Sequence, residues 1–188
     1  IMSHCLFRMH NIIQELRGNV RVFARIRPFL PDDGEQGNDS ETPLVSHDGD
    51  AKVTVVNPSN PSQRHKFAFD RVFAPSAGQE AVFEEVSEFV RSALDGYNVC
   101  LFSYGQTGSG KTHTMQGAGT GVMRGLIPRC LEQIGLHKIA EEKDGWEFSM
   151  EVSFLEIYNE TLKDLLRINL SQECKHEIKV GPDGRRKV

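Results

Sequence analysis

One stretch near the middle of the chain limits the possible folds more than any other. Residues 105–112 read Gly-Gln-Thr-Gly-Ser-Gly-Lys-Thr, which fits the pattern G-x-x-x-x-G-K-[ST], and they follow the apolar run Val99–Tyr104. The pattern indicates a phosphate-binding loop when it comes directly after a buried parallel strand. The sequence therefore predicts a buried strand over Val99–Tyr104, then a phosphate-binding loop, then a helix from Gly110.

Each residue type in this loop has a chemical reason. Gly105, Gly108 and Gly110 permit backbone conformations that let successive N–H groups converge on phosphate oxygens at the start of a helix. The Lys111 ammonium would neutralise the β- and γ-phosphates, and the Thr112 hydroxyl would bind the Mg²⁺ ion between them. A glycine-rich turn that merely joins a strand to a helix is the alternative, and the Lys-Thr pair in register argues against it.

The composition narrows the class of protein. A chain of 188 residues is long enough for one domain with a hydrophobic core. The charged fraction of 26% and hydrophobic fraction of 38% are typical of globular proteins, and no apolar run approaches the roughly 18 residues that span a bilayer. The formal net charge of −4 is too small to indicate nucleic acid. We therefore expect no membrane and no nucleic-acid partner, and the first residues lack the order of a secretory signal.

The cysteines are far apart and form no C-x-x-C pair; they are Cys5, Cys100, Cys130 and Cys174. Reduced thiols of a cytosolic protein are therefore expected, rather than a zinc site or a disulfide framework. Cys100 lies inside the apolar run and is expected to pack in the core.

The N-terminal residues have a helical pattern. Over residues 2–16 the apolar side chains recur at alternating spacings of four and three, at Met2, Leu6, Met9, Ile13 and Leu16. This is the seam of a coiled coil, and Gly18 is expected to end the helix. The seam is shorter than the about three to four heptads that identify a coiled coil, so an amphipathic helix that packs on its own domain explains it equally well.

Alternation predicts several strands. Over residues 19–27 one face is apolar, and the other carries arginines that either form a solvated surface or stack on a base. Residues 146–154 predict a long strand with one apolar face. Short strands are expected at Lys52–Val56 and His65–Phe69, joined by the turn-rich segment Asn57–Ser62. The predicted apolar faces are Val20, Val22, Ala24 and Ile26 in the first strand, and Trp146, Phe148, Met150, Val152 and Phe154 in the long one.

Helix and turn signals complete the pattern. Ser76 and Gln79 form a candidate capping box before a helix that Gly96 ends, and Pro128 indicates the start of another helix. Asn159 is expected to cap a short helix with Leu162, Leu165 and Leu166. Residues 31–43 are predicted to form an acidic surface loop, and residues 181–184 a turn.

Strands that alternate with helices, together with a phosphate loop at the carboxyl end of a strand, predict an α/β fold. In this fold class a mostly parallel sheet is covered by helices on both faces.

Six ordered stretches together resemble the kinesin motor domain, and the match extends over nearly the whole chain from Asn19 onward. They are Arg25-Ile26-Arg27-Pro28, Phe67–Phe73, Ala93–Asn98, Tyr104–Met115, Gly125–Arg129 and Phe154–Glu160, and Asp164-Leu165-Leu166 also fits. The resemblance implies a phosphate-loop α/β fold over residues 19–188 after a neck helix over residues 1–18. It also implies ATP and Mg²⁺ as ligands, microtubules as partner, a place on the cytoplasmic cytoskeleton, and a microtubule-stimulated ATPase.

The segment Leu16-Arg17-Gly18-Asn19 resembles the neck of kinesins whose motor lies C-terminal to the stalk and that move toward microtubule minus ends. This similarity favours the coiled-coil interpretation of residues 2–16, and it implies a homodimer through a longer upstream stalk.

The resemblance also implies roles for individual residues. It places Arg25 and Pro28 beside the adenine, with Tyr97 and His113 also near the nucleotide. Thr112 would hold Mg²⁺, with Lys111 as its catalytic partner. Residues 175–187 resemble the start of a loop that touches tubulin in the family. The acidic surface of tubulin would suit Arg185, Arg186 and Lys187, which would otherwise be a solvated loop tip. The phosphates would be wrapped by Gly105, Gln106, Thr107, Gly108, Ser109, Gly110, Lys111 and Thr112.

The sequence also departs from the family pattern. A kinesin head is about twice as long, and its switch motifs N-x-x-S-S-R-S-H and D-x-x-G-x-E do not occur in these 188 residues. Because phosphoryl transfer depends on positioning and charge stabilisation, these residues alone are not expected to hydrolyse ATP. In the family, strands of the other half lie beside Val99–Tyr104, so an isolated copy of this chain would expose apolar strand edges.

Two other functions stay open. One is a truncated, non-catalytic module for nucleotide binding and dimerisation, which the missing switch motifs favour. The other is a phosphate-loop GTPase or ATPase unrelated to motility. It has the least support, because a phosphate loop does not itself need Arg25–Pro28 or Phe67–Phe73.

Overall fold

The computed structural model describes residues 9, 11–30, 44–167, 177–182, 184 and 186–187, with backbone alone at the last two. The chain forms two compact units, Ile1–Glu141 and Glu142–Val188, and each is considered by itself. Several predictions lie outside the described residues: the seam positions Met2 and Leu6, the loop over residues 31–43, Cys5 and Cys174, and the Arg185 end of the basic cluster. Among the described residues, no helix is long and apolar enough to cross a membrane.

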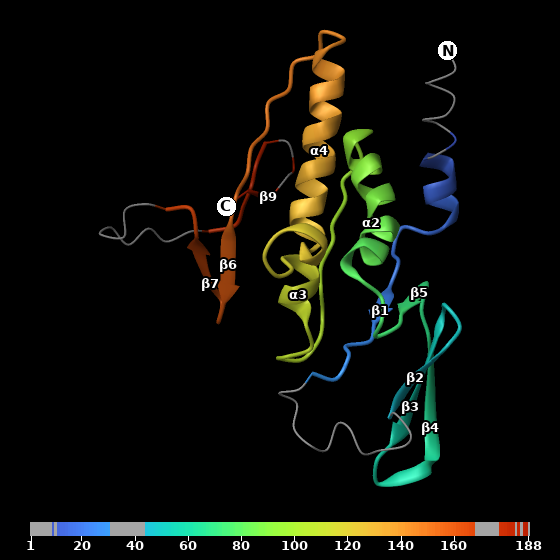
Figure 1. Ribbon diagram of the computed structural model, residues 1–188. Helices are drawn as coiled ribbons and strands as arrows, with labels where there is room; N and C mark the ends of the chain where they lie inside the picture. Colours follow the sequence, from blue (N-terminus) through green and yellow to red (C-terminus); the bar gives the residue numbers. More distant parts are fainter. Residues whose placement is uncertain are drawn as a thin grey trace. The chain divides into compact units, whose positions relative to one another are not determined.

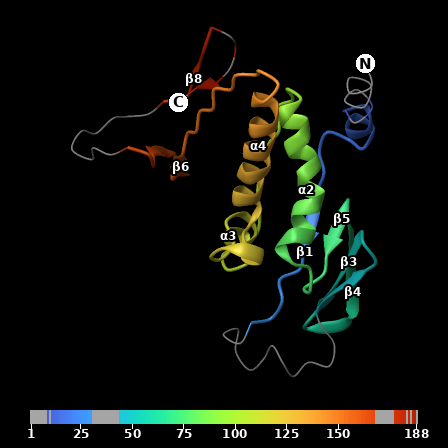
Figure 2. The same cartoon turned by 45° about the horizontal axis from the view of Figure 1, so that its top comes forward.

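The centre of the first unit is a short parallel strand pair covered by helices. Strand β1 (Phe23–Arg25) pairs in parallel with β5 (Arg71–Phe73), with Ala24 opposite Val72. Helices α2 (Gln79–Leu94) and α4 (Leu126–Glu142) lie side by side (Figures 1 and 2), and the side-chain amide of Gln133 donates to the Ser87 carbonyl at 3.3 Å. The parallel pair and its helices therefore agree with the predicted α/β class.

The hydrophobic core lies where α2 and α4 meet these strands. Its buried members are Phe73, Val82, Val86 and Leu126, and the half-buried side chains that pack on it are Phe23, Ala77, Phe83, Met115 and Cys130. The helical spacing predicts an apolar face of Phe83, Val86, Val90 and Leu94 on α2. Val86 and Val90 are buried as predicted, Phe83 and Leu94 are half-buried, and Val82 completes the buried face. Pro128 lies in the first turn of α4 and Gly96, with φ +102°, follows α2, as the sequence predicted.

The capping box predicted before α2 is wrong. The N-cap residue is Gly78, and no side chain caps the helix. Gln79 is instead the first residue of the helix and is buried, with 4% of its surface exposed. Its side-chain amide bonds to other segments, so it cannot return to the start of its own helix.

The predicted strand over residues 19–27 is confirmed only over Phe23–Arg25, and the face with Phe23, which was not the predicted apolar face, packs on the core. Val20 and Val22 are 81% and 53% exposed, whereas the Phe23 ring lies edge-on to Phe73 at 6.2 Å. Because an aromatic ring buries more apolar surface than a valine, the face with Phe23 turns inward. Arg21 and Arg25 lie on the same face of the chain and are therefore partly buried with it. Of these arginines, Arg21 and Arg25 are half-buried and Arg27 is exposed, so they do not form a fully solvated row.

A separate antiparallel sheet consists of β2 (Val45–Asp48), β3 (Lys52–Asn57) and β4 (Asn60–Ala68), in the order β2-β3-β4. The two predicted strands are confirmed as β3 and β4. The turn between them is tighter than the predicted Asn57–Ser62, because the Ser59 N–H donates to the Asn57 side chain at 2.9 Å. Strand β2 was missed, since its four residues carry too little alternation to be recognised.

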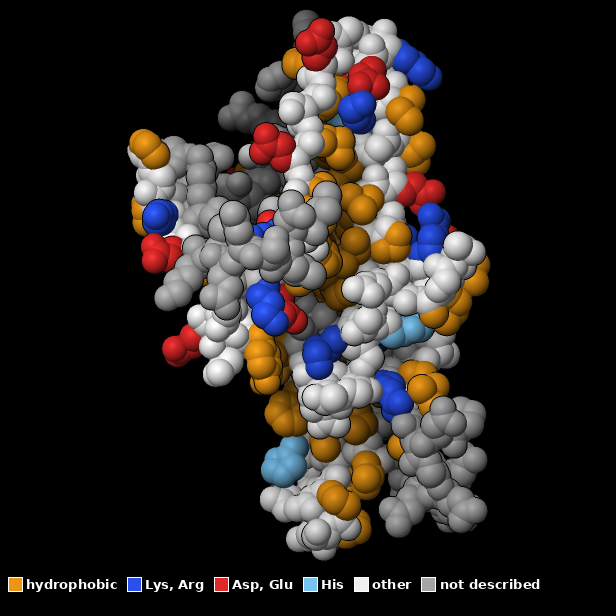
Figure 3. All heavy atoms as spheres, turned by 90° about the vertical axis from the view of Figure 1, so that its left-hand side faces the viewer, with side chains coloured by type: hydrophobic (Ala, Val, Ile, Leu, Met, Phe, Trp, Pro, Cys, Tyr) orange, Lys and Arg blue, Asp and Glu red, His pale blue; other side chains and the backbone are white. Residues whose placement is uncertain are grey.

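The apolar run Val99–Tyr104 is not the buried strand that was predicted. It forms no strand, and among the described residues none pairs with it. Phe102 and Tyr104 are 81% and 94% exposed, Cys100 is exposed rather than packed in the core, and hydrophobic side chains lie open on the face drawn in Figure 3. A strand is stable only when its backbone groups pair with neighbours, and these residues have no such neighbour here.

The two cysteines that the structure describes, Cys100 and Cys130, are expected to differ in reactivity. Burial raises the pKa of the Cys130 thiol, so less of it is thiolate near neutral pH, whereas Cys100 is exposed. Brief treatment with a maleimide and peptide mass spectrometry should find Cys100 modified well before Cys130. In denaturant the two should react alike, and faster labelling of native Cys130 would contradict the structure.

The described part of the second unit contains two hairpins, and the predicted long strand is not among its strands. Residues 146–154 form no strand, and Trp146 and Val152 are 64% and 69% exposed. Strand β6 (Leu155–Tyr158) turns directly into β7 (Thr161–Asp164), and the two pair in antiparallel fashion. Strands β8 (Lys179–Val180) and β9 (Arg186–Lys187) form the second hairpin.

The turns of these hairpins explain one failed and one successful prediction. Asn159 and Glu160 have φ of 48° and 59°, the signature of a tight two-residue hairpin turn, so Asn159 caps no helix. Leu162 lies in β7, and the predicted short helix is wrong. The predicted turn over residues 181–184 is confirmed, because the Gly184 N–H donates to the Gly181 carbonyl at 2.9 Å.

Candidate nucleotide-binding site

The glycines of the candidate phosphate loop have the backbone that the motif requires. Gly108 has φ +80° and Gly110 has φ +93°, a region that residues with a side chain rarely adopt. Gly110 is also the N-cap of the short helix α3 (Lys111–Met115), so the predicted helix start is confirmed. The loop therefore turns from the extended run into a helix within residues 105–110.

The loop folds closely on itself. The Ser109 N–H donates to the Gln106 carbonyl at 3.2 Å, and a Cβ at Gly105 would lie 2.5 Å from Ser109 Oγ. That hydroxyl is buried and has no hydrogen-bond partner. A glycine cradle with an unsatisfied hydroxyl fits an oxyanion ligand such as a phosphate.

Lys111 points back over the loop. Its Nζ donates to the carbonyls of Gly105 and Gln106, each at 2.8 Å. These two bonds hold the ammonium at the loop rather than in solvent. Thr112 and His113 follow on α3 and are exposed, so the Thr112 hydroxyl is open to a metal ion.

Arg25 lies beside this helix, but its guanidinium bonds to protein groups. One nitrogen donates to Gln79 Oε1 at 2.8 Å and to Thr114 Oγ1 at 3.0 Å, and the other donates to the Ala77 carbonyl at 3.2 Å. Burial lowers the pKa of Arg25 from its usual value. The structure thus brings Arg25 to α3, and Pro28 follows β1 as an exposed residue.

Tyr97 is not brought to the loop. Its N–H donates to the Ser92 carbonyl at 3.1 Å at the C-terminal end of α2, and its side chain is 46% exposed. Gln79, which contacts α3, is at the other end of this 16-residue helix. At a rise of about 1.5 Å per residue the two ends are roughly 24 Å apart.

Gln79 is the residue of this region that sequence reasoning missed. Its amide contacts Arg25, the His113 carbonyl and the Met123 carbonyl. No pattern marks it, because a glutamine is usually exposed and its partners here are far away in the sequence.

The N-terminal helix contacts α2 through its polar side chains. Asn11 donates to Asp95 at 3.1 Å, and Gln14 donates to Glu88 at 3.3 Å. The described seam positions remain exposed, at 55% for Met9, 51% for Ile13 and 82% for Leu16, and Gly18, with φ +95°, follows the helix as predicted. The helix therefore packs on its own domain and still presents an apolar face.

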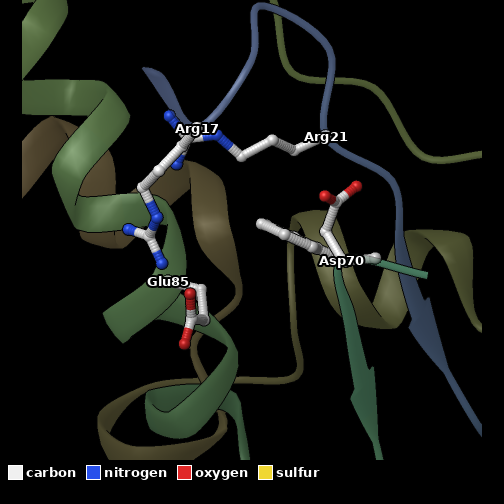
Figure 4. Close-up of a pocket in the computed structure, with 5 residues that line it drawn as sticks. Arg17, Arg21, Asp70 and Glu85 are labelled. Carbon is white, nitrogen blue, oxygen red and sulfur yellow. The ribbon is translucent and has the colours of Figure 1, made fainter. Parts of the chain in front are cut away.

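A hollow of about 240 Å³ lies where this helix joins the domain. It is lined by Arg17, Arg21, Phe23, Asp70 and Glu85, with Arg17 above Glu85 and Asp70 across from them (Figure 4). Arg21 donates to the Gln14 side chain, and its guanidinium lies 4.5 Å from the centre of the Phe89 ring. Burial and then the charge of Arg17 lower the pKa of Arg21. None of the lining residues belongs to the phosphate loop, so this is a junction rather than part of the candidate site.

Comparison with known proteins shows the class of this chain. A family model described as "Microtubule binding" matches residues 7–166. The chain is 50% identical over 162 residues to kinesin-like protein KIN-14D of Arabidopsis thaliana, and 46% identical over 177 residues to kinesin-like protein KIFC1 of Homo sapiens. The chain thus belongs to the kinesin motor-domain family, and the resemblance predicted from its motifs is confirmed.

Solved structures point to the same group. One described as the C-terminal motor and motor homology domain of Kar3Vik1 matches with a TM-score of 0.85 and 37% identity over 99% of this chain. The motor domain of the Kar3-like kinesin from Ashbya gossypii matches with a TM-score of 0.71 and 39% identity over 88% of it. The predicted α/β kinesin fold and the similarity to C-terminal motors are therefore confirmed.

The matches cover most of this chain but only part of its relatives. Aligned residues are 85% of this chain, 20% of KIN-14D and 26% of human KIFC1. For the two solved chains the covered share is 48% and 50%.

Proposed function

We propose that this chain is the nucleotide-binding part of a kinesin motor and that residues 105–112 bind Mg-ATP. The observation that carries the proposal is the Lys111 ammonium, which two loop carbonyls hold at 2.8 Å over a glycine cradle. The buried Ser109 hydroxyl without a partner also supports it. Bound Mg²⁺ would draw charge from the phosphates and fix their geometry.

In this proposal the loop residues have separate tasks. Lys111 binds the terminal phosphates and the Thr112 hydroxyl holds Mg²⁺. Arg25, Pro28 and His113 lie on the side of the base, and Tyr97 is left out because it lies at the far end of α2. The phosphate oxygens take N–H donors from Gly105, Gln106, Thr107, Gly108, Ser109 and Gly110.

For the intact protein we propose coupling of ATP hydrolysis to movement along microtubules, directed to the minus end, in a dimer joined by an upstream coiled coil. Membership in the kinesin family supports the motor, and the names of the solved C-terminal motors support its subfamily. The exposed seam positions Ile13 and Leu16 support a helical partner. A place on microtubules of the cytoplasm, including the spindle, follows from the same proposal.

The Mg²⁺ role of Thr112 can be tested by metal removal. In the full native protein, EDTA should weaken ATP binding by the wild type, because bound Mg²⁺ no longer joins the hydroxyl to the phosphates. Thr112→Ala should bind ATP in Mg²⁺ about as weakly as the wild type does in EDTA, and should respond little to EDTA. Titration with a fluorescent ATP analogue measures both.

The matched control for this test is Thr120→Ala, an exposed threonine of the loop before η3 (Gly121–Met123). It should bind and respond to EDTA like the wild type. Normal Mg²⁺ dependence in Thr112→Ala would show that another residue holds the metal.

The motor proposal can be tested on the native gene product through its intact mass, its peptide sequences and its ATPase rate with and without microtubules. We expect microtubule-stimulated turnover together with peptides that contain the switch motifs. Turnover that microtubules do not stimulate would contradict the proposal.

A further inference from the structure

The buried amide of Gln79 has no task in the proposed phosphate chemistry, yet its contacts converge on the helix that follows the phosphate loop. Its Oε1 accepts from Arg25 at 2.8 Å, and its Nε2 donates to the His113 carbonyl at 2.6 Å and to the Met123 carbonyl at 3.4 Å. One side chain at the start of α2 thus joins β1, α3 and the loop that contains η3.

These partners fix both the residue type and its orientation. A guanidinium can only donate and a carbonyl can only accept, so the oxygen of the amide must face Arg25 and its nitrogen must face the carbonyls. An ionised glutamate would lose the donors, and a leucine would lose donors and acceptor alike. The glutamate would leave the His113 carbonyl without its bond, and the leucine would leave both this carbonyl and the Arg25 guanidinium without theirs.

Helix α3 depends on such contacts for its position. It has five residues and none of them is buried, whereas a helix needs about 12 residues to be marginally stable alone. What holds it is the Gln79 bond to the His113 carbonyl, the Arg25 bond to Thr114 and the packing of Met115 on the core cluster. The His113 carbonyl lies in the last turn, where carbonyls lack helical partners, so the Gln79 amide takes the place of a missing backbone donor.

We propose that Gln79 is a positioning residue for nucleotide binding. By fixing α3 through the His113 carbonyl, it sets the place of Lys111 and Thr112 at the phosphates. The inference rests on the proposed function, because it takes residues 105–112 as the site of the phosphates. Gln79 acts through α3 and touches neither the base nor the phosphates.

The test compares ligands with and without a base. In the full native protein, Gln79→Leu should weaken the binding of Mg-ATP, Mg-GTP and Mg-tripolyphosphate, each by at least about tenfold, the loss expected when partly buried hydrogen bonds of a charged group are removed. A contact of this region with adenine would instead weaken ATP alone and leave tripolyphosphate unchanged. That outcome would overturn the proposal.

Val90→Ala is the control for general loss of stability. Val90 is buried on the same helix, with 5% exposure, and lies outside the core cluster on which Met115 packs. Its truncation should lower the melting temperature at least as much as Gln79→Leu, without changing any of the three dissociation constants of the folded protein. If Val90→Ala weakens binding as much as Gln79→Leu, the effect is ordinary destabilisation and the proposal is wrong.

Gln79→Glu separates the two halves of the amide. The carboxylate still accepts from Arg25 but cannot donate to the carbonyls, so binding should fall nearly as far as in Gln79→Leu. Wild-type affinity in this variant would contradict the proposed route through His113. If the wild type itself binds none of the three ligands, the proposed function fails first; if it binds them and Gln79→Leu binds equally, only the present inference fails.

Discussion

Replacing Lys111 with alanine is expected to reduce ATP binding on the order of a hundredfold or more and to abolish ATP turnover by the intact protein. The ammonium is held at the loop by the carbonyls of Gly105 and Gln106, each at 2.8 Å. A unit charge about 4 Å from a phosphate oxygen contributes about 4 kcal/mol at the effective dielectric constant of about 20 found near protein surfaces. Part of this attraction is offset because the ammonium must give up its bonds to the loop carbonyls when it binds phosphate. We therefore expect a loss of ATP affinity of about a hundredfold, less than the full attraction would give.

The measurement is a binding titration with a fluorescent ATP analogue, followed by the ATPase rate with and without microtubules. Lys143→Ala is the control, since Lys143 is exposed and lies outside the loop. It should bind like the wild type. Lys111→Arg keeps the charge but not the compact ammonium, so its affinity for ATP should lie between that of Lys111→Ala and that of the wild type. Unchanged affinity in Lys111→Ala would remove the principal support for nucleotide binding at residues 105–112.

Replacing Gly117 with alanine is expected to cost about 3 kcal/mol of stability, from a backbone conformation costly for alanine and from steric overlap. Gly117 has φ +81°, and a Cβ there would overlap the Met123 carbonyl oxygen and lie 2.7 Å from the carbonyl carbon of Arg124. The backbones cross here, because Gly117 and Arg124 form an isolated bridge. For a protein of this size the melting temperature should fall by roughly 6–12 °C.

A neighbouring glycine provides the control for the second prediction. Gly119 has φ +62°, and nothing lies within 4 Å of the Cβ it would gain. Gly119→Ala should therefore show only the conformational cost of about 1 kcal/mol. Thermal unfolding of both variants checks the prediction. Equal losses would mean that the backbones at Gly117 do not approach as closely as the structure has them.

The features that could be predicted from sequence depend on local chemistry. The backbone of the candidate phosphate loop, the helix start at Gly110 and the turn at Gly184 follow from glycines whose φ few other residues can adopt. The apolar face of α2 follows from the helical period, which needs no knowledge of the partner.

What could not be predicted depends on distant partners. The alternation of residues 19–27 identified a strand but not its inner face, because the packing of Phe23 on Phe73 and Phe89 decides that. Gln79 was assigned to a capping box because its three partners lie 34 or more residues away along the chain. Local pattern cannot choose among such partners.

The failed strand predictions have the same physical origin. Alternation over residues 146–154 shows that they suit a pleated, half-buried surface, but a strand also needs a neighbour for its backbone groups. Residues Thr161–Asp164 pair with Leu155–Tyr158 and therefore form a strand rather than a helix. The tight turn between them is possible because Asn159 adopts a positive φ.

The unpaired run Val99–Tyr104 has a thermodynamic consequence for the loop that follows it. Tyr104 is bonded directly to Gly105, so any strand that pairs with this run also restricts where the phosphate loop begins. Pairing of the run and binding of nucleotide both require the same residues to lose conformational entropy. Whichever event occurs first already orders these residues, so the second event costs less free energy. Strand pairing should tighten nucleotide binding and nucleotide should stabilise the pairing, each by the same factor. The run Val99–Tyr104 therefore couples the free energy of strand pairing to the free energy of nucleotide binding at the loop.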